Sequence, residues 1–236
     1  MNSLLDNDKS YSTELSRAFF RNVYTYMFGA LGISGAIAYM VGADEATFHS
    51  IFISGKSISP LFWVVAFAPL ILGLVIQTAY QRLTMGTLIM LFIAYSGLMG
   101  LSLSSIFLVY KIGAIASTFF VTAGAFGGMA ILGYTTKTDL TKFGSLLYMV
   151  FIGMFIAAII NIFIANNTIG FIIACLGVFV FTGLTAYYMQ QLKEISKSPV
   201  LNEEERNKLS LIGGLTLYIL FINLFLSLLR IMGSRD

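Results

Sequence analysis

The stretch that decides the fold is Leu211–Met232, which reads LIGGLTLYILFINLFLSLLRIM. About 20 apolar residues, at roughly 1.5 Å of rise each, cross the hydrocarbon core of a bilayer, so this stretch predicts a membrane-spanning helix. Small and polar residues share one stripe of that helix: Gly213, Thr216, Asn223 and Ser227. Leu220 is the large apolar residue that interrupts the stripe. Because amide and hydroxyl groups need partners in hydrocarbon, the stripe predicts a helix that faces protein, with the other spans gathered around it.

The composition indicates a membrane protein that crosses the bilayer several times. The chain has 236 residues, of which 58% are hydrophobic and 11% are charged. Soluble domains carry about 25% charged residues. The formal net charge of +3 is small and dispersed, which argues against a nucleic-acid partner. Cys175 is the single cysteine, so no internal disulfide can form.

Six further apolar runs precede the last one. They are Tyr24–Val41, Pro60–Ala79, Leu83–Tyr110, Ile112–Leu132, Leu140–Ala165 and Ile169–Gln190. The sequence therefore predicts an all-α membrane protein with seven transmembrane helices. We expect residues 1–21 to form a cytoplasmic polar tail, residues 22–232 a single seven-helix domain, and residues 233–236 a short C-terminal tail.

Local signals mark helix ends and close contacts. Asn202 fits an N-cap, and Glu205 stands at the capping-box position three residues later. Asp139 suits the N-terminus of the fifth helix, and capping is the simplest interpretation of both acidic positions. Gly124 and Gly128 have the GxxxG spacing, which allows two membrane helices to approach closely.

The distribution of lysine and arginine predicts the orientation in the membrane. With seven spans, ten of these residues lie on the side of the N-terminus and four on the other side. Positive charge gathers on the cytoplasmic side, so the N-terminus should be cytoplasmic and the C-terminus outside.

Several classes of enzyme and metal site are excluded by residue type. His49 is the only histidine and lies in a predicted loop, and no glycine-rich nucleotide loop is present. All eleven acidic residues fall in tails, loops or helix ends, so no span centre offers a carboxylate to a proton relay or a divalent cation. We therefore expect no enzyme, no cofactor and no metal site.

Neutral polar residues and one arginine remain as candidates for a site inside the membrane. The candidates for an ion path or polar core are Asn223, Thr216, Ser227, Asn161 and Arg82. One interpretation is that the asparagines make hydrogen bonds between helices and that the arginine reaches the interface along its aliphatic stem. The other is that they line a polar cavity into which the arginine points.

Five motifs in order carry a resemblance to a known family. They are FRNVYTYM at Phe20–Met27, GYTTKTDL at Gly133–Leu140, NIF at Asn161–Phe163, LTAYYMQQLK at Leu184–Lys193 and the segment Leu215–Asp236. Together they resemble the Bax inhibitor-1/YccA family, from about Arg21 to the C-terminus. The resemblance implies a bacterial inner-membrane protein in which the last of seven helices is surrounded by the other six.

The resemblance also implies a function and shows a departure from it. Family members are associated with a calcium leak that pH gates through two aspartates, whereas YccA-type relatives modulate a membrane-bound quality-control protease. Here Tyr188 and Leu220 stand where those aspartates would be. Two nearby carboxylates can share a proton near neutral pH, which tyrosine and leucine cannot do.

Two functional hypotheses follow. The first is a passive cation leak, of the calcium type, that does not respond to pH between about 6 and 8 because the aspartate pair is absent. The alternative is a non-conducting regulator of a membrane protease. A continuous polar cavity reaching Asn223 and Arg82 would favour the leak, and a sealed core would favour the regulator.

Overall fold

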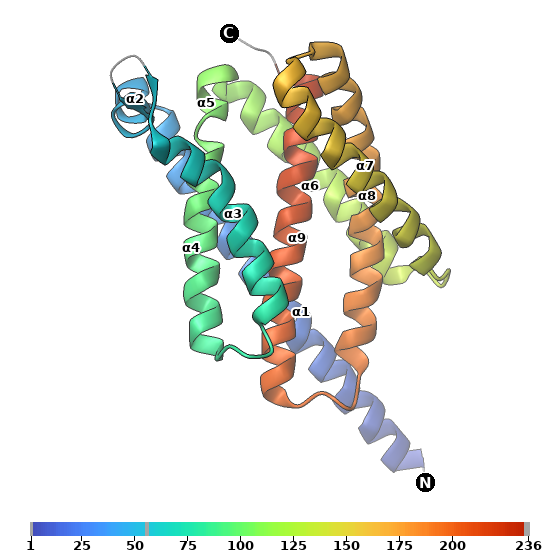
Figure 1. Cartoon of the computed structure of the whole chain (residues 1–236). Helices are drawn as coiled ribbons and strands as arrows, with labels where there is room; N and C mark the ends of the chain where they lie inside the picture. The colour runs from blue at the N-terminus through green and yellow to red at the C-terminus, as the bar shows by residue number, and fades with distance from the viewer. Residues whose placement is uncertain (1, 55–56, 234–236) are drawn as a thin grey trace. The chain divides into compact units, whose positions relative to one another are not determined.

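The computed structural model of the chain describes residues 2–54 and 57–233, and is helical almost throughout (Figure 1). The helices are α1 (Asn2–Gly42), α2 (Glu45–Phe52), α3 (Pro60–Ala79), α4 (Met85–Leu103), α5 (Ile106–Val109), α6 (Ile112–Thr135), α7 (Thr141–Ile164), α8 (Asn167–Lys197) and α9 (Glu203–Met232). Two-residue strands β1 (Ile53–Ser54) and β2 (Ser57–Ile58) pair antiparallel between α2 and α3.

The prediction of an all-α membrane protein with seven spans is confirmed. Seven helical segments in the described part of the chain are long and apolar enough to cross a membrane. The third span is less regular than predicted, because Ser104 and Ser105 separate α4 from α5. The last two helices continue beyond their apolar runs, since α8 extends to Lys197 and α9 begins at Glu203. Hydropathy detects the apolar run but not the polar turns that prolong a helix outside the bilayer.

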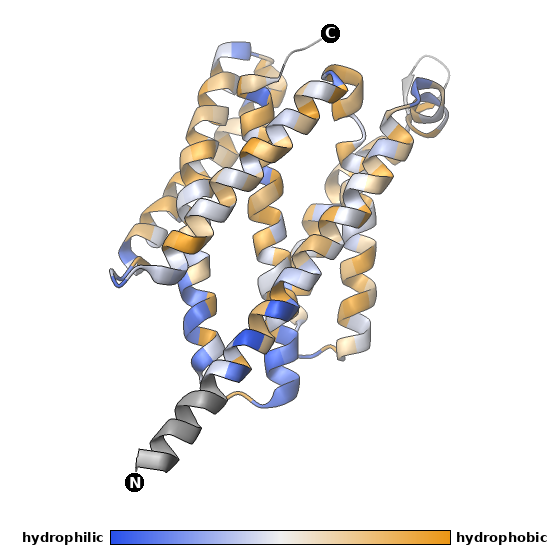
Figure 2. Ribbon diagram, turned by 180° about the vertical axis from the view of Figure 1, so that it is seen from behind, coloured by the Kyte–Doolittle hydropathy of each residue, from blue (hydrophilic) through white to orange (hydrophobic). Residues whose placement is uncertain are grey.

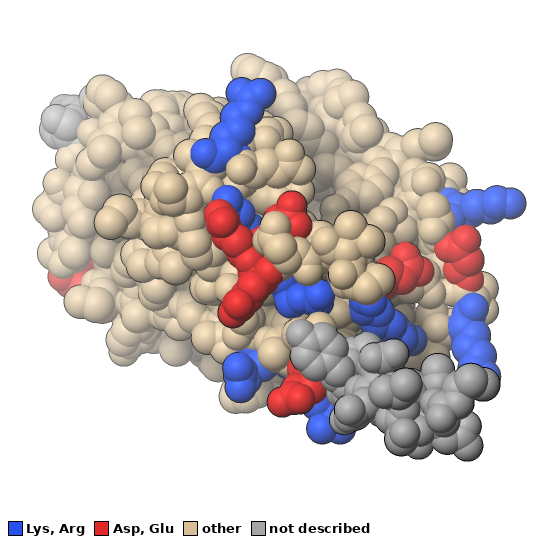
Figure 3. Space-filling view, turned by 90° about the horizontal axis from the view of Figure 1, so that it is seen from below, with Lys and Arg blue, Asp and Glu red and all other residues tan. Residues whose placement is uncertain are grey.

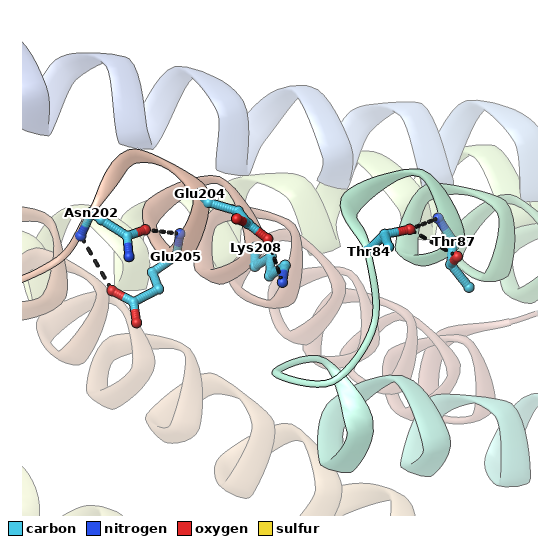
Figure 4. Close-up of polar contacts among 6 residues, drawn as sticks. All are labelled: Thr84, Thr87, Asn202, Glu204, Glu205 and Lys208. Atoms are coloured by element: carbon cyan, nitrogen blue, oxygen red, sulfur yellow. Dashed lines mark hydrogen bonds and ion pairs between the residues drawn. The ribbon is translucent and has the colours of Figure 1, made fainter.

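Side-chain caps explain where several helices begin (Figure 4). Asn202 Oδ1 accepts the Glu205 N–H at 2.8 Å, while Glu205 Oε2 accepts the Asn202 N–H at 3.2 Å. This reciprocal pair is the capping box predicted from the sequence. Thr84 Oγ1 accepts the Thr87 N–H at 3.3 Å and caps α4 as a simple side-chain N-cap, without a reciprocal bond to the Thr84 N–H.

The contacts divide the chain into two units. Among the described residues, the first unit contains those up to Tyr110 together with Ser196–Tyr218, and the second contains Lys111–Ile195 and residues 219–233. Helix α9 therefore contributes its first half to one unit and its second half to the other. It is the most buried of the seven spans, with 67% of its apolar window buried. The helix as a whole therefore packs against protein, while Thr216, Asn223 and Ser227 of its polar stripe are only half-buried.

In the first unit, α1 packs against α4, and α3 packs against α4. Gly100 lets α1 and α4 meet closely, because a Cβ there would lie 2.7 Å from the Ser34 carbonyl oxygen. The rings of Tyr95 and Tyr218 meet edge to face at 6.0 Å. The Tyr218 hydroxyl faces Ser34. The Ser34 hydroxyl, however, donates its hydrogen to the Ala30 carbonyl within α1. Tyr218 therefore makes no hydrogen bond to any described residue.

In the same unit, hydrogen bonds fix the end of α8 and the α8–α9 connection to α9 and to α1. Arg206 is buried, and its guanidinium donates to the Ser196 carbonyl at 2.9 Å and to the Ser198 carbonyl at 3.1 Å. The Ser16 and Ser196 hydroxyls are hydrogen-bonded at 2.7 Å, which attaches α1 to the end of α8. The predicted boundary between residues 21 and 22 falls inside α1, so the described tail continues the first span as one helix.

Hydrophilic residues gather at helix ends. Figure 2 shows them at the C-terminal end of α8 and the N-terminal end of α9, beyond the apolar middle of each helix. Seen from below, acidic and basic side chains alternate on the visible surface rather than forming a patch of one sign (Figure 3). That mixture is typical of solvated helix ends rather than of a nucleic-acid surface.

Candidate functional site

A cavity of about 230 Å³ lies between α7, α8 and α9 in the second unit. Helix α9 contributes its polar lining, which consists of Asn223, Ser227 and Arg230. Helices α7 and α8 supply apolar walls, among them Phe151 and Ile173. The cavity is therefore polar on one side and apolar on the other sides, as in many small-molecule sites.

The three polar residues share one face of α9 because they are spaced at i, i+4 and i+7. Asn223 Nδ2 donates to the Ile219 carbonyl at 2.8 Å, and the Ser227 hydroxyl donates to the Asn223 carbonyl at 2.8 Å. Both hydrogen bonds stay within α9. Each side chain therefore keeps further hydrogen-bonding atoms that are available to the cavity. This hydrogen bond of Asn223 lies within α9 and thus differs from the interhelical bond considered from the sequence.

Glycines of α8 make room for the polar face of α9. A Cβ at Gly170 would lie 1.7 Å from Arg230 Nη2, and a Cβ at Gly177 would lie 2.5 Å from Ser227 Oγ. Gly124 and Gly128 behave differently, because an added Cβ there meets nothing within 4 Å in the described chain. The close approach predicted for the GxxxG pair is therefore made by other glycines.

Arg230 has no ion pair or hydrogen bond to the residues that the structure describes. It lies in the last turn of α9 and is exposed. In the sequence, Arg230 counts only as one of the four basic residues predicted to lie on the outer side. Its position seven residues after Asn223 was the available signal that it shares the polar face.

Tyr188 and Leu220 are the two positions that the resemblance matches to the family's aspartates. Tyr188 is half-buried on α8, and its hydroxyl is hydrogen-bonded to the Tyr148 hydroxyl of α7. The two rings meet edge to face at 6.3 Å. Leu220 of α9 is only 5% exposed and belongs to the apolar core. Neither position presents a carboxylate.

The remaining sequence candidates do not line the cavity. Asn161 lies near the end of α7, where its Oδ1 accepts the Asn166 N–H at 3.2 Å and shapes the turn into α8. Arg82 is exposed in the turn between α3 and α4, and Thr216 is half-buried in the first-unit part of α9. The structure thus brings Asn223 and Ser227 to one cavity and places the other three elsewhere.

A second polar cluster joins two of the family-like motifs. The Gln190 side chain accepts the Leu140 N–H at 2.8 Å and donates to the Thr138 carbonyl at 2.8 Å. Asp139 accepts the Thr141 N–H at 2.9 Å, and hydrogen bonding to the side chain and the N–H of Thr141 lowers the pKa of its carboxyl. The motif at the end of α8 therefore holds the loop that starts α7, which is a structural role.

The described residues contain no group of three or more His, Cys, Asp or Glu side chains that could hold a metal ion. The polar contribution to the cavity is an amide, a hydroxyl and a guanidinium. A guanidinium attracts anions, and hard cations prefer carboxylate oxygens.

Comparison with known proteins identifies the family. The family model described as "Inhibitor of apoptosis-promoting Bax1" matches residues 16–236. The chain belongs to the Bax inhibitor-1 family. This finding confirms the resemblance inferred from the five motifs.

Bacterial members of the Bax inhibitor-1 family are similar along nearly the whole chain. "Inner membrane protein YbhL" of Escherichia coli K12 is 40% identical over 220 residues, covering 93% of this chain and 92% of the relative. An uncharacterized protein of Borreliella burgdorferi is 40% identical over 223 residues, covering 94% of both chains. One of Caulobacter vibrioides is 41% identical over 223 residues, covering 93% of this chain and 89% of the relative.

Proposed function

We propose that this Bax inhibitor-1 protein is a non-conducting regulator of a membrane-bound partner, of the quality-control protease kind that the family resemblance implies. The observation that carries the proposal is the state of the two gating positions. Tyr188 is bonded to Tyr148, and Leu220 is packed in the core. A calcium ion takes six to eight oxygen ligands, usually with carboxylates among them, and these positions offer none.

The electrostatics of the cavity support the same proposal. The charged group in its lining is Arg230, which repels a cation approaching Asn223. The lining does not include Arg82, the second residue that a continuous path was expected to reach. The cavity therefore offers cations no attractive site along its polar face.

A passive cation leak without pH control is the second candidate. The observation in its favour is that the cavity does reach Asn223 and Ser227 inside the apolar part of α9. Neither side chain titrates near neutral pH, so such a leak would not respond to pH. Calcium would then be one of several cations carried.

For localisation, we propose the bacterial inner membrane, because the Escherichia coli relative is named an inner membrane protein. The orientation that we propose follows from the lysine and arginine distribution, with the N-terminus cytoplasmic and the C-terminus outside. We propose no catalytic activity and no cofactor.

The deciding experiment is calcium flux into proteoliposomes at about pH 6 and about pH 8, where a coupled carboxylate pair would titrate. We compare the unmodified protein with the Tyr188→Asp/Leu220→Asp variant and with the neutral Tyr188→Asn/Leu220→Asn variant as a matched control. The regulator proposal expects no flux above that of protein-free liposomes in the unmodified protein, and pH-dependent flux only in the double aspartate variant.

Other outcomes discriminate between the candidates. A leak in the unmodified protein that is the same at both pH values would replace the regulator with the passive leak. Strongly pH-dependent flux in the unmodified protein would refute the role assigned to the missing carboxylates. The proposed regulation of a membrane protease is tested separately, by comparing the degradation rate of the protease's substrates in cells with and without the gene.

A further inference from the structure

We propose that the cavity between α7, α8 and α9 binds one anionic phospholipid, with the lipid phosphate at Arg230 and an acyl chain along the apolar walls. The regulator proposal can be tested separately from this site, whereas a lipid here would occupy the space that the leak candidate gives to cations. The lipid proposal rests on the charge, the shape and the position of the cavity.

Arg230 is suited to hold the phosphate. Its guanidinium presents a planar fork of donors that matches phosphate oxygens, and no described carboxylate occupies that fork. Gly170 leaves the space in which the guanidinium lies, because even a Cβ there would collide with Nη2. A larger residue at position 170 would displace the group from the cavity.

The dipole of helix α8 adds a second attraction for an anion near Arg230, although Asn166 Oδ1 already accepts the Thr168 and Ile169 N–H groups. Helix α8 begins at Asn167, so Gly170 lies in its first turn and lines the cavity. The N-terminal end of a helix carries a partial positive charge, equivalent to roughly half an elementary charge. The charged end of the cavity is thus formed by a cationic side chain and the positive end of a helix.

The position of Arg230 matches the depth of lipid phosphates. It lies at the end of the apolar run of α9, where a spanning helix leaves the hydrocarbon core. Asn223 lies seven residues earlier, which is roughly 10 Å deeper along the helix axis. One Asn223 amide hydrogen is bonded to Ile219, and the other is available to an ester carbonyl of the lipid.

The walls of the cavity suit an acyl chain. Phe151, Met154 and Phe155 of α7 line it, and Phe155 is 43% exposed, so the cavity reaches the outer surface of the unit. Helix α7 is the least buried span, with 6% of its apolar window buried, and is therefore the wall that adjoins lipid. A volume of about 230 Å³ is smaller than the ~300–1,000 Å³ of pockets for whole drug-sized ligands, so part of one lipid fills it.

The test measures lipid binding to the purified full-length protein by native mass spectrometry. The probes are dioctanoyl phosphatidylglycerol, its zwitterionic phosphatidylcholine counterpart and inorganic phosphate. Arg230→Gln removes the charge, Arg230→Lys keeps it without the fork, and Arg82→Gln is the matched control at an exposed arginine outside the cavity. Ala158→Phe fills the cavity, and Ala157→Phe adds the same volume next to a residue that lines it.

The unmodified protein should bind one phosphatidylglycerol saturably and more tightly than phosphatidylcholine. Losing the guanidinium should weaken that binding by roughly tenfold or more, because charge-assisted hydrogen bonds are lost. Arg230→Lys should retain part of the affinity, and Arg82→Gln all of it. Ala158→Phe should weaken binding while Ala157→Phe should not.

Three results would overturn the proposal. Equal binding of both lipids by the unmodified protein would remove the role of charge. Equal phosphatidylglycerol binding by Arg230→Gln and Arg82→Gln would show that Arg230 only reaches the interface along its stem, without a site. Displacement of phosphatidylglycerol by an equal concentration of inorganic phosphate would indicate a free-anion site that takes no acyl chain.

Discussion

The Tyr188 hydroxyl of α8 is hydrogen-bonded to the Tyr148 hydroxyl of α7, at a position where the family resemblance places an acidic side chain. The pair joins two helices of the second unit through neutral groups. A carboxylate at position 188 would lie beside a hydroxyl rather than beside a second carboxylate, because Leu220 fills the other family position. Tyr188 and Leu220 are therefore best understood as a pair, because an aspartate at only one of the two positions would be a charge without its partner carboxylate.

The tyrosine pair should be coupled energetically. Tyr188→Phe and Tyr148→Phe should each lower the free energy of unfolding by about 1 kcal/mol, because each removes one hydrogen bond and leaves a half-buried hydroxyl. The double variant should cost less than the sum of the two. Chemical unfolding of the unmodified protein, the two single variants and the double variant in detergent measures this double-mutant cycle. Strictly additive losses would show that the two hydroxyls do not interact in the folded protein.

Gln190 should be more important for stability than its exposed counterpart Gln81. Gln190→Ala removes two hydrogen bonds to the α6–α7 loop and leaves the Leu140 N–H without its acceptor. We expect a loss of about 1–3 kcal/mol. Gln81→Ala, at an exposed position, should stay within about 0.5 kcal/mol. Equal losses of stability in the two variants, measured by the same unfolding assay, would show that Gln190 does not stabilise the α6–α7 loop.

Arg206 should hold the α8–α9 connection. Arg206→Ala removes both bonds of the guanidinium, to the Ser196 and Ser198 carbonyls, and should cost about 3 kcal/mol because charged donors make stronger bonds. Arg206→Lys should recover part of this, since an ammonium group cannot reproduce the fork. Limited proteolysis of the connection should accelerate in the same order. Unchanged cleavage in Arg206→Ala would show that the connection is held by other contacts.

Much of the fold could be predicted from local patterns. The length and hydropathy of the runs identified all seven spans, and Asn202 with Glu205 identified the start of α9. Both signals depend on neighbouring residues in one helix, so a single sequence contains them. The break at Ser104 and Ser105 was missed because hydroxyl residues are tolerated inside spans, where they bond to their own backbone.

Less of the candidate site could be predicted, because it depends on which helices meet. Asn223 and Ser227 of the polar stripe both line the cavity, but periodicity cannot select the helices that face them. Gly170 and Gly177 form no GxxxG spacing, so their contact with α9 was not visible in the sequence. Arg230 was counted only among the basic residues of the outer side, because hydropathy alone does not show that a cavity lies beside it.

The orientation can be tested with single cysteines in a Cys175→Ser background. Lys137→Cys lies in the loop between α6 and α7, and Asn167→Cys lies at the start of α8, both at exposed positions. The excess of basic residues on one side predicts that the α6–α7 loop is cytoplasmic. A membrane-impermeant maleimide should label Asn167→Cys in intact spheroplasts, and Lys137→Cys only after lysis. The reverse pattern would invert the topology.

The short helix α2 should lose its N-cap in acid. Asp44 accepts the Ala46 N–H at 3.3 Å and the Thr47 N–H at 3.2 Å, and bonding to Thr47 lowers the pKa of its carboxyl below the usual value of about 3.9. A lowered pKa in the folded state means that the carboxylate stabilises α2 above the unfolded pKa and that this contribution is lost as pH falls through the folded pKa. Amide exchange at Ala46 and Thr47, corrected for intrinsic rates, should therefore show falling protection as pH drops from about 5 to about 3.

Asp44→Asn is the matched control, because asparagine also caps helices but does not titrate. Protection of the same two amides in this variant should not change with pH. The same acid-induced loss in Asp44→Asn would assign the effect to another group.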